Sequence, residues 1–522
     1  MARVLVTERI APGGLELLAD AGHEVDVREG LDPDGLVEAI RGAAALIIRS
    51  ATKATSQVIE AGSDLVVIGR AGVGIDNVDV EAATARGVMV VNAPESNILS
   101  AAEQAMALLL AQARNLPQAH NALVQGRWER SRFEGVELHG KTLGIAGLGR
   151  VGTLVAQRAH AFGMRLLAYD PYVSAERAQR LGVELRSMEE LVFESDFLSI
   201  HLPKNSETIG LIGADLLAKA KRGIRVINTA QGGIIDEEAL ASAVRSGQVA
   251  GAGIDVFATE PTTESPLFGL ESVVVTPHLG ASTAEAQDKA GVTIAEQVLL
   301  ALSGDFVPLA VNVAASAVSE GVRPFMALAE SLGRFFGCLH DRVPGTMEVE
   351  VAGGLASERT DILTLCALKG LFASSSDEPV SYVNAPKVAK EHGVAVRESS
   401  TPAASGYVNL VTLRSADHSV AATLTDEPKR EARVVMVDSH RVEVSPTPHM
   451  LVIRNDDRPG MIGIVGTALG QAEISIRSMA LAPSDHGGTA LMVLSVEPEV
   501  SASVAHDLAG RDGILGVDRV IL

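Results

Sequence analysis

The sequence predicts an α/β protein with two doubly wound, Rossmann-like parallel-sheet domains, followed by an α+β domain and a small βαββαβ module. Three observations support this prediction. Short apolar runs alternate with helical patterns from residue 3 to about 98, and the alternation starts again near residue 142. Strands that alternate with helices indicate parallel sheets. After residue 305 the alternation stops, and the residues from 449 onward are typical of strand, turn, helix, strand, strand, helix, strand.

The composition supports this fold class and excludes several functions. Hydrophobic residues make up 47% of the 522 residues but aromatic ones only 3%, so the cores must consist mainly of Ala, Val, Leu and Ile. Such cores are common in alternating βα units. The formal net charge is −21. A surface so acidic repels nucleic-acid backbones and anionic membranes, so neither is expected as a partner. A small anionic substrate remains possible because a local group of arginines outweighs distant charge.

The first alternating series predicts a parallel sheet near the N-terminus. Its expected strands are 4–6, 24–27, 45–48, 65–68 and 88–92, and its expected helices are 14–21, 33–41, 56–61 and 77–86. One long helix with an alanine-rich face is expected from Ser100 to about Gln125. That face is too apolar for solvent, which favours a homo-oligomer, a dimer or a tetramer.

The second series predicts a separate parallel sheet and sets the domain boundaries. Its strands are expected at 142–146, 165–169, 197–200, 226–228, 251–255 and 273–276. The helix expected from Thr283 to Ser303 is roughly 30 Å long, enough to return the chain to the first sheet. We therefore expect a discontinuous substrate-binding domain (1–98 plus 284–306), a cofactor-binding domain (99–283), an intervening regulatory domain (307–446) and a terminal module (447–522).

A glycine-rich turn in the second sheet predicts a dinucleotide site. Gly147, Gly149 and Gly152 lie between a strand and a helix. The first glycine allows a tight turn, the second lets backbone N–H groups approach a pyrophosphate, and the third lets the helix pack on the strand. Asp170 ends the next strand, 18 residues after Gly152. A carboxylate there accepts from ribose hydroxyls and repels a 2′-phosphate, so the expected cofactor is NAD.

Two further residues are typical of hydride transfer to or from a hydroxy acid, which needs a proton acceptor. His278 follows a strand of the second sheet, where catalytic groups of doubly wound folds lie. Glu260 is a carboxylate that can orient the imidazole and raise its pKa. A cation that binds the substrate carboxylate is expected in the loop after Asn228, but that loop reads Asn-Thr-Ala-Gln-Gly-Gly.

Five ordered segments resemble the D-isomer-specific 2-hydroxyacid dehydrogenases. They are Gly147–Gly152 with Asp170, Ser195–Pro203, Asn228–Asp236, Asp255–Pro261 and Thr276–Ala281. Residues Arg70–Asp79 and the C-terminal extension resemble the long members of that family. Those members oxidise 3-phospho-D-glycerate to 3-phosphohydroxypyruvate, the first step of the phosphorylated route to L-serine.

The resemblance implies roles for individual residues. It implies that His278 is the acid/base and Glu260 its partner. Cofactor contacts are implied at Arg150, Val151, Asp170, Pro203, Thr229, Ala230, Asp255, His278, Leu279, Gly280 and Ala281. Substrate contacts are implied at Arg49, Arg70 and Asn97, with Arg130 reaching in from a second subunit. Planar guanidinium groups bind phosphate and carboxylate well.

One residue departs from the family pattern. The family carries Arg where this chain has Gln231, and that Arg binds the substrate carboxylate and polarises the carbonyl. An amide donates only a neutral hydrogen bond, of about 0.5–1.5 kcal/mol against about 1.5–3 for a charge-assisted one. The exchange predicts a loss of roughly one to two powers of ten in turnover. Arg222 and Arg225 are near in sequence, but nothing in the sequence shows that either replaces it.

The terminal module resembles ACT domains, which bind small amino acids at subunit interfaces. Asn455 and Asp457 match positions that contact L-serine in that family, and Ser475 stands where the family often has Asn. Both cysteines, Cys338 and Cys366, lie in apolar stretches without metal-ligand spacing, so we expect free thiols and no metal site. The N-terminus does not resemble a signal peptide, and a cytoplasmic protein is expected.

Two alternatives stay open at this point. One is a reductase of another 2-keto acid such as 2-oxoglutarate. The other is an amino-acid-sensing oligomer of low activity whose dinucleotide domain is a scaffold, an alternative that Gln231 favours.

Overall fold

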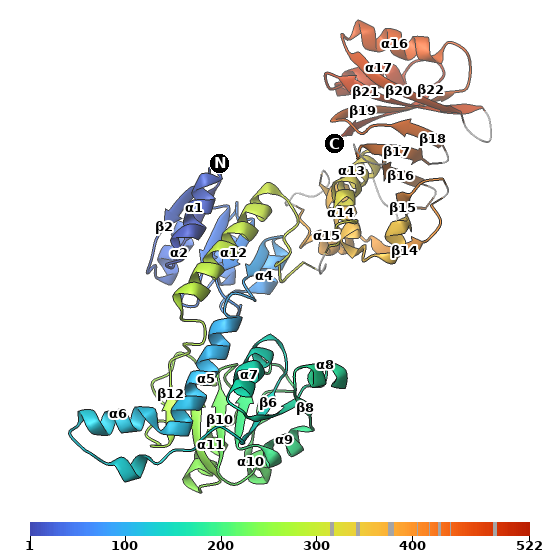
Figure 1. Cartoon of the computed structure of the whole chain (residues 1–522). Helices are drawn as coiled ribbons and strands as arrows, with labels where there is room; N and C mark the ends of the chain where they lie inside the picture. The colour runs from blue at the N-terminus through green and yellow to red at the C-terminus, as the bar shows by residue number, and fades with distance from the viewer. Residues whose placement is uncertain are drawn as a thin grey trace.

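The computed structural model describes residues 1–313, 318–340, 345–373, 380–404, 406–416, 418–425, 430–438, 440–483 and 488–522. Four sheets follow one another along the chain, and Figure 1 shows them as successive bodies from the blue N-terminal sheet to the red C-terminal module. The predicted α/β class with two parallel sheets, a mixed sheet and a terminal ACT-like module is confirmed. None of the helices in these ranges is long and apolar enough to cross a bilayer.

The first sheet has the strand order β2-β1-β3-β4-β5 and is parallel throughout. Its elements are β1 (Arg3–Val6), α1 (Pro12–Asp20), β2 (Glu24–Val27), α2 (Pro33–Ala39), β3 (Ala45–Ile48), α3 (Ser56–Ala61), β4 (Val67–Arg70), α4 (Val80–Ala85) and β5 (Met89–Asn92). Helix α12 (Ala284–Ser303) returns to this sheet and packs on α1 and β4. The packing is close because Gly14 faces the Gly291 carbonyl, where a Cβ would lie only 2.6 Å from the oxygen.

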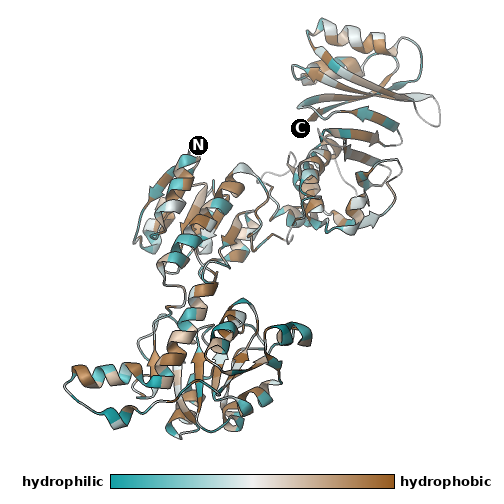
Figure 2. Ribbon diagram, viewed as in Figure 1, coloured by the Kyte–Doolittle hydropathy of each residue, from teal (hydrophilic) through white to brown (hydrophobic). Residues whose placement is uncertain are grey.

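The second sheet has the order β12-β11-β10-β9-β6-β7-β8 and is also parallel. Its strands are β6 (Thr142–Ala146), β7 (Arg165–Tyr169), β8 (Glu184–Leu185), β9 (Phe197–Ile200), β10 (Ile224–Asn228), β11 (Val249–Ile254) and β12 (Val273–Val275). Its helices are α5 (Ile98–Arg114), α6 (Leu116–Val124), η1 (Arg130–Phe133), α7 (Arg150–Ala161), α8 (Ala175–Arg180), α9 (Met188–Glu194), α10 (Ala214–Lys219) and α11 (Glu237–Arg245). In Figure 2 the central strands are mostly brown, as expected for a sheet covered on both faces.

The prediction of a single long helix over residues 100–125 is wrong. The structure divides it into α5 and α6 at Asn115, which has φ 52° and ends α5 in the left-handed conformation. Pro117 lies in the first turn of α6, where its missing N–H costs no hydrogen bond. The alanine-rich face is also buried inside the chain: Ala102, Ala105 and Ala113 pack in the core beside α7. This face therefore does not support the expected oligomer.

The third sheet is mixed, with the order β14-β13-β15-β16-β17-β18 among the described residues. Its elements are α13 (Pro324–Leu339), β13 (Thr346–Gly353), η2 (Gly354–Ser357), α14 (Asp361–Phe372), α15 (Ala385–Glu391), β14 (Ala395–Thr401), β15 (Asn409–Ser415), β16 (His418–Leu424), β17 (Ala432–Val437) and β18 (His440–Val444). Helices α13 and α14 pack closely because Gly333 and Gly370 each face a backbone carbonyl of the other helix.

The fourth sheet is antiparallel, with the order β20-β21-β19-β22. Its elements are β19 (His449–Asp456), α16 (Met461–Gln471), β20 (Ser475–Pro483), β21 (Thr489–Glu497), α17 (Ala502–Ala509) and β22 (Ile514–Ile521). One face of the sheet packs under α16 and α17. Residues of the other face, including Met450 and Val493, join the core formed by α13 and α14.

Candidate active site

The glycine-rich turn connects β6 to α7 and leaves open space at one of its three glycines. Gly147 has φ 97°, and a Cβ there would lie 2.6 Å from the His201 carbonyl oxygen. A Cβ on Gly152 would lie 2.0 Å from the Gly147 carbonyl oxygen. Around Gly149, by contrast, no atom lies within 4 Å of the Cβ position. Packing within the protein thus requires glycine at positions 147 and 152, whereas Gly149 borders open space that a ligand could fill.

Asp170 is held directly beside this turn. It follows β7, and its carboxylate accepts hydrogen bonds from Leu148 N at 2.8 Å and from Tyr172 N at 2.9 Å. The carboxylate therefore lies where an adenosine ribose on the glycine turn would reach it. The neighbouring Arg150 is exposed and pairs with Glu95 at 2.5 Å, which links the start of α7 to the loop after β5.

The loop after β10 is shaped by a buried amide and a glycine. Asn228 is buried; its Nδ2 donates to Gln231 O at 3.1 Å, and its Oδ1 accepts from Ala230 N at 3.1 Å. A Cβ on Gly232 would lie 1.7 Å from the Phe257 carbonyl oxygen, so the loop contacts the segment after β11. Among the described residues, the half-buried Gln231 side chain has no hydrogen-bond partner, and neither does the buried Thr229 Oγ1.

Asp255 organises the loop that carries His278. Its side chain is fully buried, and its carboxylate accepts from Thr276 Oγ1 at 2.6 Å, Leu279 N at 2.8 Å and Gly280 N at 2.8 Å. The Asp255 carbonyl also accepts from His278 N at 2.8 Å. His278 itself has φ 53°, an uncommon conformation for a non-glycine residue. Because both carboxylate oxygens bind this loop, Asp255 fixes the backbone that presents the imidazole.

His278 and Glu260 form a hydrogen-bonded pair. His278 Nδ1 lies 2.6 Å from Glu260 Oε2, while Glu260 Oε1 accepts from Phe257 N at 2.8 Å. An ionised carboxylate can only accept, so Nδ1 carries the proton and Nε2 keeps a free lone pair. The imidazole side chain is 50% exposed, so this nitrogen can reach a substrate.

The pair changes the acid–base properties of both residues. The hydrogen bond to Glu260 raises the pKa of His278 above its usual value, although burial opposes the change. Burial acts to raise the pKa of Glu260, but the bonds from His278 and Phe257 N–H outweigh it and hold that pKa low. Glu260 is therefore ionised at neutral pH, and its charge favours the protonated form of His278, as a residue that must accept a proton needs.

Two arginines lie at the corresponding edge of the first sheet. Arg70 ends β4, and Arg49 follows β3, the neighbouring strand. Burial lowers the pKa of Arg70, and the nearby Arg49 charge adds to that lowering, while Glu8 opposes it. Arg70 Nε is buried without a hydrogen-bond partner among the described residues. Arg70 also lies near enough to His278 to lower the pKa of that imidazole. Arg49 and Arg70 repel one another, and Arg70 also acts on His278, so this edge favours an anionic ligand.

The remaining expected site residues lie in three places. The cofactor candidates follow the carboxyl ends of parallel strands, which meet at one edge of the second sheet: Gly147, Gly149, Arg150, Val151, Gly152, Asp170, Pro203, Thr229, Ala230, Asp255, Leu279, Gly280 and Ala281. Asn97 lies at the start of α5, with no side-chain cap bond. Arg130 is exposed in η1, beyond α6, and Figure 1 shows this cyan arm projecting from the second sheet away from the first.

The structure also shows a supporting residue that the sequence did not reveal. Glu8 accepts hydrogen bonds from the backbone N–H groups of Arg49, Ala51 and Thr52 at 2.8, 3.1 and 2.9 Å, and so holds the loop that carries Arg49. Glu8 lies two residues beyond the first expected strand, but a lone acid at such a position gives no indication of three backbone partners.

The three effector candidates are not brought together within one chain. Asn455 is 1% exposed, and its Oδ1 has no hydrogen-bond partner among the described residues. Asp457 is exposed in the following turn. Asn455 pairs with Ala490 of β21, whereas Ser475 pairs with Glu497 at the other end of that strand. Seven residues of β-strand separate the two positions by roughly 24 Å.

Comparisons with known proteins agree with this geometry. The D-isomer specific 2-hydroxyacid dehydrogenase NAD-binding domain matches residues 106–280, the D-3-phosphoglycerate dehydrogenase intervening domain matches 321–438, and the ACT domain matches 449–509. A D-3-phosphoglycerate dehydrogenase of Mycobacterium tuberculosis is 47% identical over 97% of this chain and 96% of its own length. One of Synechocystis is 41% identical over 98% and 94%.

Solved structures show similarity over about three-fifths of the chain. The TT0316 protein of Thermus thermophilus superposes with a TM-score of 0.55 and 36% identity, covering 59% of this chain and 99% of that one. D-lactate dehydrogenase of Escherichia coli gives a TM-score of 0.55 and 26% identity, covering 60% and 100%. The chain is therefore an NAD-dependent dehydrogenase that belongs to the D-3-phosphoglycerate dehydrogenases within the D-isomer-specific 2-hydroxyacid dehydrogenase family.

Proposed function

We propose that this enzyme oxidises 3-phospho-D-glycerate to 3-phosphohydroxypyruvate with NAD, the first step of the phosphorylated route to L-serine. The observation that carries the proposal is the His278–Glu260 pair, with Arg70 close enough to affect the pKa of His278. A proton acceptor beside cationic groups suits an anionic substrate whose hydroxyl must lose a proton. The names of the relatives support the choice of substrate.

The proposed chemistry assigns one task to each part of the pair. His278 Nε2 takes the proton of the C2 hydroxyl, because Nδ1 is held by Glu260. Glu260 stabilises the imidazolium that forms, since the carboxylate lies 2.6 Å from the charged ring. In the reverse direction the protonated His278 returns the proton to the carbonyl oxygen. Bound NAD supplies the hydride acceptor.

The cofactor would occupy the carboxyl edge of the second sheet. The open space at Gly149 leaves room for a pyrophosphate at the start of α7, and the unpartnered Thr229 Oγ1 offers a hydrogen bond to a ligand. Asp170 would bind the adenosine ribose and exclude a 2′-phosphate. These features fit NAD, which the family assignment also supports.

Arg49, Arg70 and Asn97 would bind the phosphate and carboxylate of the substrate. Gln231 would orient the carboxylate through its amide, which has no partner among the described residues. This neutral residue was also the reason to consider a reductase of another 2-keto acid such as 2-oxoglutarate, an alternative that the similarity to D-3-phosphoglycerate dehydrogenases does not favour. The paired His278 and Glu260 speak against a catalytically silent scaffold.

A comparison of phosphorylated and unphosphorylated hydroxy acids tests the proposal. NADH formation is followed with 3-phospho-D-glycerate and with D-glycerate, for the unmodified enzyme and for Arg70→Gln. We expect 3-phospho-D-glycerate to be the better substrate and Arg70→Gln to lose most of that preference while NADH binding persists. Arg86→Gln, at the half-buried arginine that follows α4, serves as control. Equal kcat/KM for the two acids in the unmodified enzyme would contradict the proposal.

The same proposal includes regulation and assembly. The ACT module would bind an amino acid, L-serine. Asn455 and Asp457 would come from one chain and Ser475 from a second, because these positions lie far apart within one chain.

Assembly as a homodimer or homotetramer is supported by the exposed apolar side chains Leu123, Val124 and Trp128 on α6 and the following loop. Both cysteines are free, which supports the expected cytoplasmic location.

A further inference from the structure

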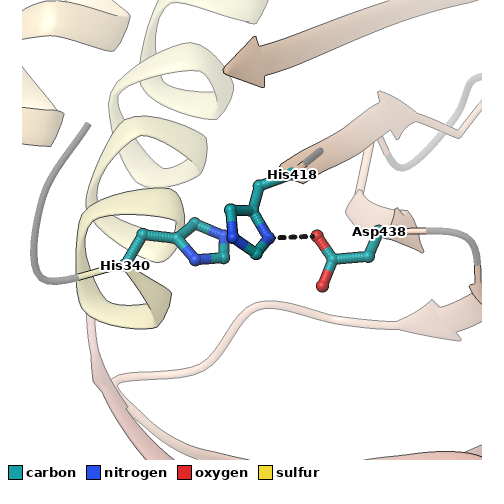
Figure 3. Close-up of side chains that lie close together, drawn as sticks. All are labelled: His340, His418 and Asp438. Atoms are coloured by element: carbon teal, nitrogen blue, oxygen red, sulfur yellow. Dashed lines mark hydrogen bonds and ion pairs between the residues drawn. The ribbon is translucent and has the colours of Figure 1, made fainter. Parts of the chain in front are cut away.

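Two histidines and one aspartate gather in the third sheet, far from the dehydrogenase site. His340 directly follows α13, His418 begins β16 and Asp438 follows β17. Figure 3 shows the two imidazole rings side by side, with Asp438 next to His418. One potential ligand atom from each residue lies within 4.8 Å of the other two. Because these residues are spread over about a hundred positions, no sequence motif predicted a metal site there.

We propose that His340, His418 and Asp438 bind one divalent transition-metal ion of the Zn²⁺ class. Two imidazoles and one carboxylate are common ligands of such ions, and a water completes the tetrahedral shell. The proposal concerns a site apart from the dehydrogenase chemistry and does not rest on the proposed substrate.

The distances within the cluster suit a metal better than a hydrogen bond. His418 Nδ1 and Asp438 Oδ1 are 3.3 Å apart, which is long for a charge-assisted hydrogen bond. Neighbouring ligand atoms of a tetrahedral zinc are separated by about 3.3 Å, given bonds of about 2.0–2.1 Å. The rings of His340 and His418 are stacked, with centroids 3.7 Å apart and planes inclined by 28°, so the two imidazoles lie directly beside one another.

His340 provides an observation independent of this spacing. Its side chain is buried, and its Nε2 has no hydrogen-bond partner among the described residues. A buried polar nitrogen without a partner is costly, and a metal ion would satisfy it. Burial lowers the pKa of His340 to about 4, so the ring is neutral at physiological pH, as a ligand must be.

The surroundings hold the Asp438 carboxylate in place beside His418. Asp438 Oδ1 also accepts from Ser419 N at 3.2 Å, and Asp438 is left-handed with φ 51°. Arg454, from the first strand of the ACT module, lies 3.8 Å from Asp438 Oδ2 but pairs more closely with Asp518, at 2.5 Å. The carboxylates of Asp438 and Asp518 thus offset the guanidinium charge beside the site. A metal on Asp438 would connect the third sheet to the ACT module through Arg454.

Equilibrium dialysis of the full-length, chelator-treated protein against Zn²⁺, followed by elemental analysis, tests this proposal. We expect the unmodified protein to bind about one Zn²⁺ per chain. His418→Asn and Asp438→Asn should each weaken this binding about ten-fold or more. Asn tolerates the left-handed conformation at residue 438, so that variant keeps its backbone. His120→Asn, which removes an exposed histidine of α6, should bind as the unmodified protein does.

Circular dichroism of the metal-free variants checks that they are folded; His418 is 44% exposed, so its replacement should be tolerated. Retained Zn²⁺ in both variants would overturn the proposal, since the metal would then be bound elsewhere. A concentration of about 100 µM Zn²⁺ is far above the dissociation constants of folded zinc sites. If the unmodified chain bound no Zn²⁺ at that concentration, the proposal would also be overturned, and the three residues would form only a hydrogen-bonded His–Asp cluster.

Discussion

Glu260 accepts the Nδ1 proton of His278 at 2.6 Å, and the same carboxylate accepts the backbone N–H of Phe257 at 2.8 Å. The first contact raises the pKa of the imidazole, and the second holds the carboxylate in place. The basicity of His278 therefore depends on a side chain 18 residues earlier in the chain.

Replacing Glu260 with Gln should move the pH dependence of turnover. In the oxidation direction His278 must be neutral, so kcat/KM rises with pH through its pKa. Glu260→Gln removes the charge that raises this pKa, and the limb should move to lower pH while the maximal rate falls. The pH–rate profile of kcat/KM measures both effects. An unmoved limb would mean that Glu260 only supports the loop.

Asp170 should determine the choice between NAD and NADP. Asp170→Ala removes the charge that repels a 2′-phosphate, so the preference for NAD should narrow by about ten-fold or more in kcat/KM. The variant also loses the hydrogen bond that Leu148 N donates to Asp170, so its thermal unfolding temperature is measured to check that it remains as stable as the unmodified enzyme. Asp215→Ala, an acid in the first turn of α10, should leave the preference unchanged. If the unmodified enzyme used NADP with the same kcat/KM as NAD, the role assigned to Asp170 would be wrong.

Gln231→Arg should raise kcat/KM for phosphohydroxypyruvate by roughly ten-fold or more, which requires only about 1.4 kcal/mol. The loop after β10 lies beside Phe257, whose N–H binds Glu260, and an arginine in this loop would add a charge-assisted bond to the substrate carboxylate. NADH affinity should hardly change. Equal or lower activity would indicate a pocket adapted to Gln231, and would shift weight to 2-oxoglutarate or another keto acid.

The α6 arm should hold two chains together. Leu123 and Val124 are 56% and 73% exposed, and Leu123→Asp with Val124→Asp should lower the mass measured by light scattering at micromolar concentration. Phe193→Asp changes a residue of α9 that is 68% exposed and should leave the mass unaltered. A monomeric unmodified chain would contradict the proposed assembly.

The sequence predicted the fold class because the alternation of apolar strands and helices is a local signal. It failed at Asn115, where a left-handed residue ends α5 although the apolar pattern continues into α6. It also could not show that α7 and the second sheet cover the alanines of α5, since that contact joins distant segments. The exact division of the chain into four domains stays a prediction.

The candidate site was predictable to a similar degree. His278 and Glu260 were expected as partners from their types and their order, and the structure brings them into contact. The part of Asp255 in holding the His278 loop was not visible, because its three backbone and side-chain partners are identified only in the folded chain. The separation of Asn455 and Ser475 followed from strand register, which the sequence did not define. The individual roles of the site residues remain to be tested.

The most direct test of the account is NADH consumption with 3-phosphohydroxypyruvate and with 2-oxoglutarate, for the unmodified enzyme and for His278→Ala. We expect phosphohydroxypyruvate to have the higher kcat/KM, and His278→Ala to abolish turnover while NADH binding stays within a few-fold, because the imidazole supplies the proton and not the cofactor site. Undiminished turnover in His278→Ala, or a clear preference for 2-oxoglutarate in the unmodified enzyme, would contradict the account.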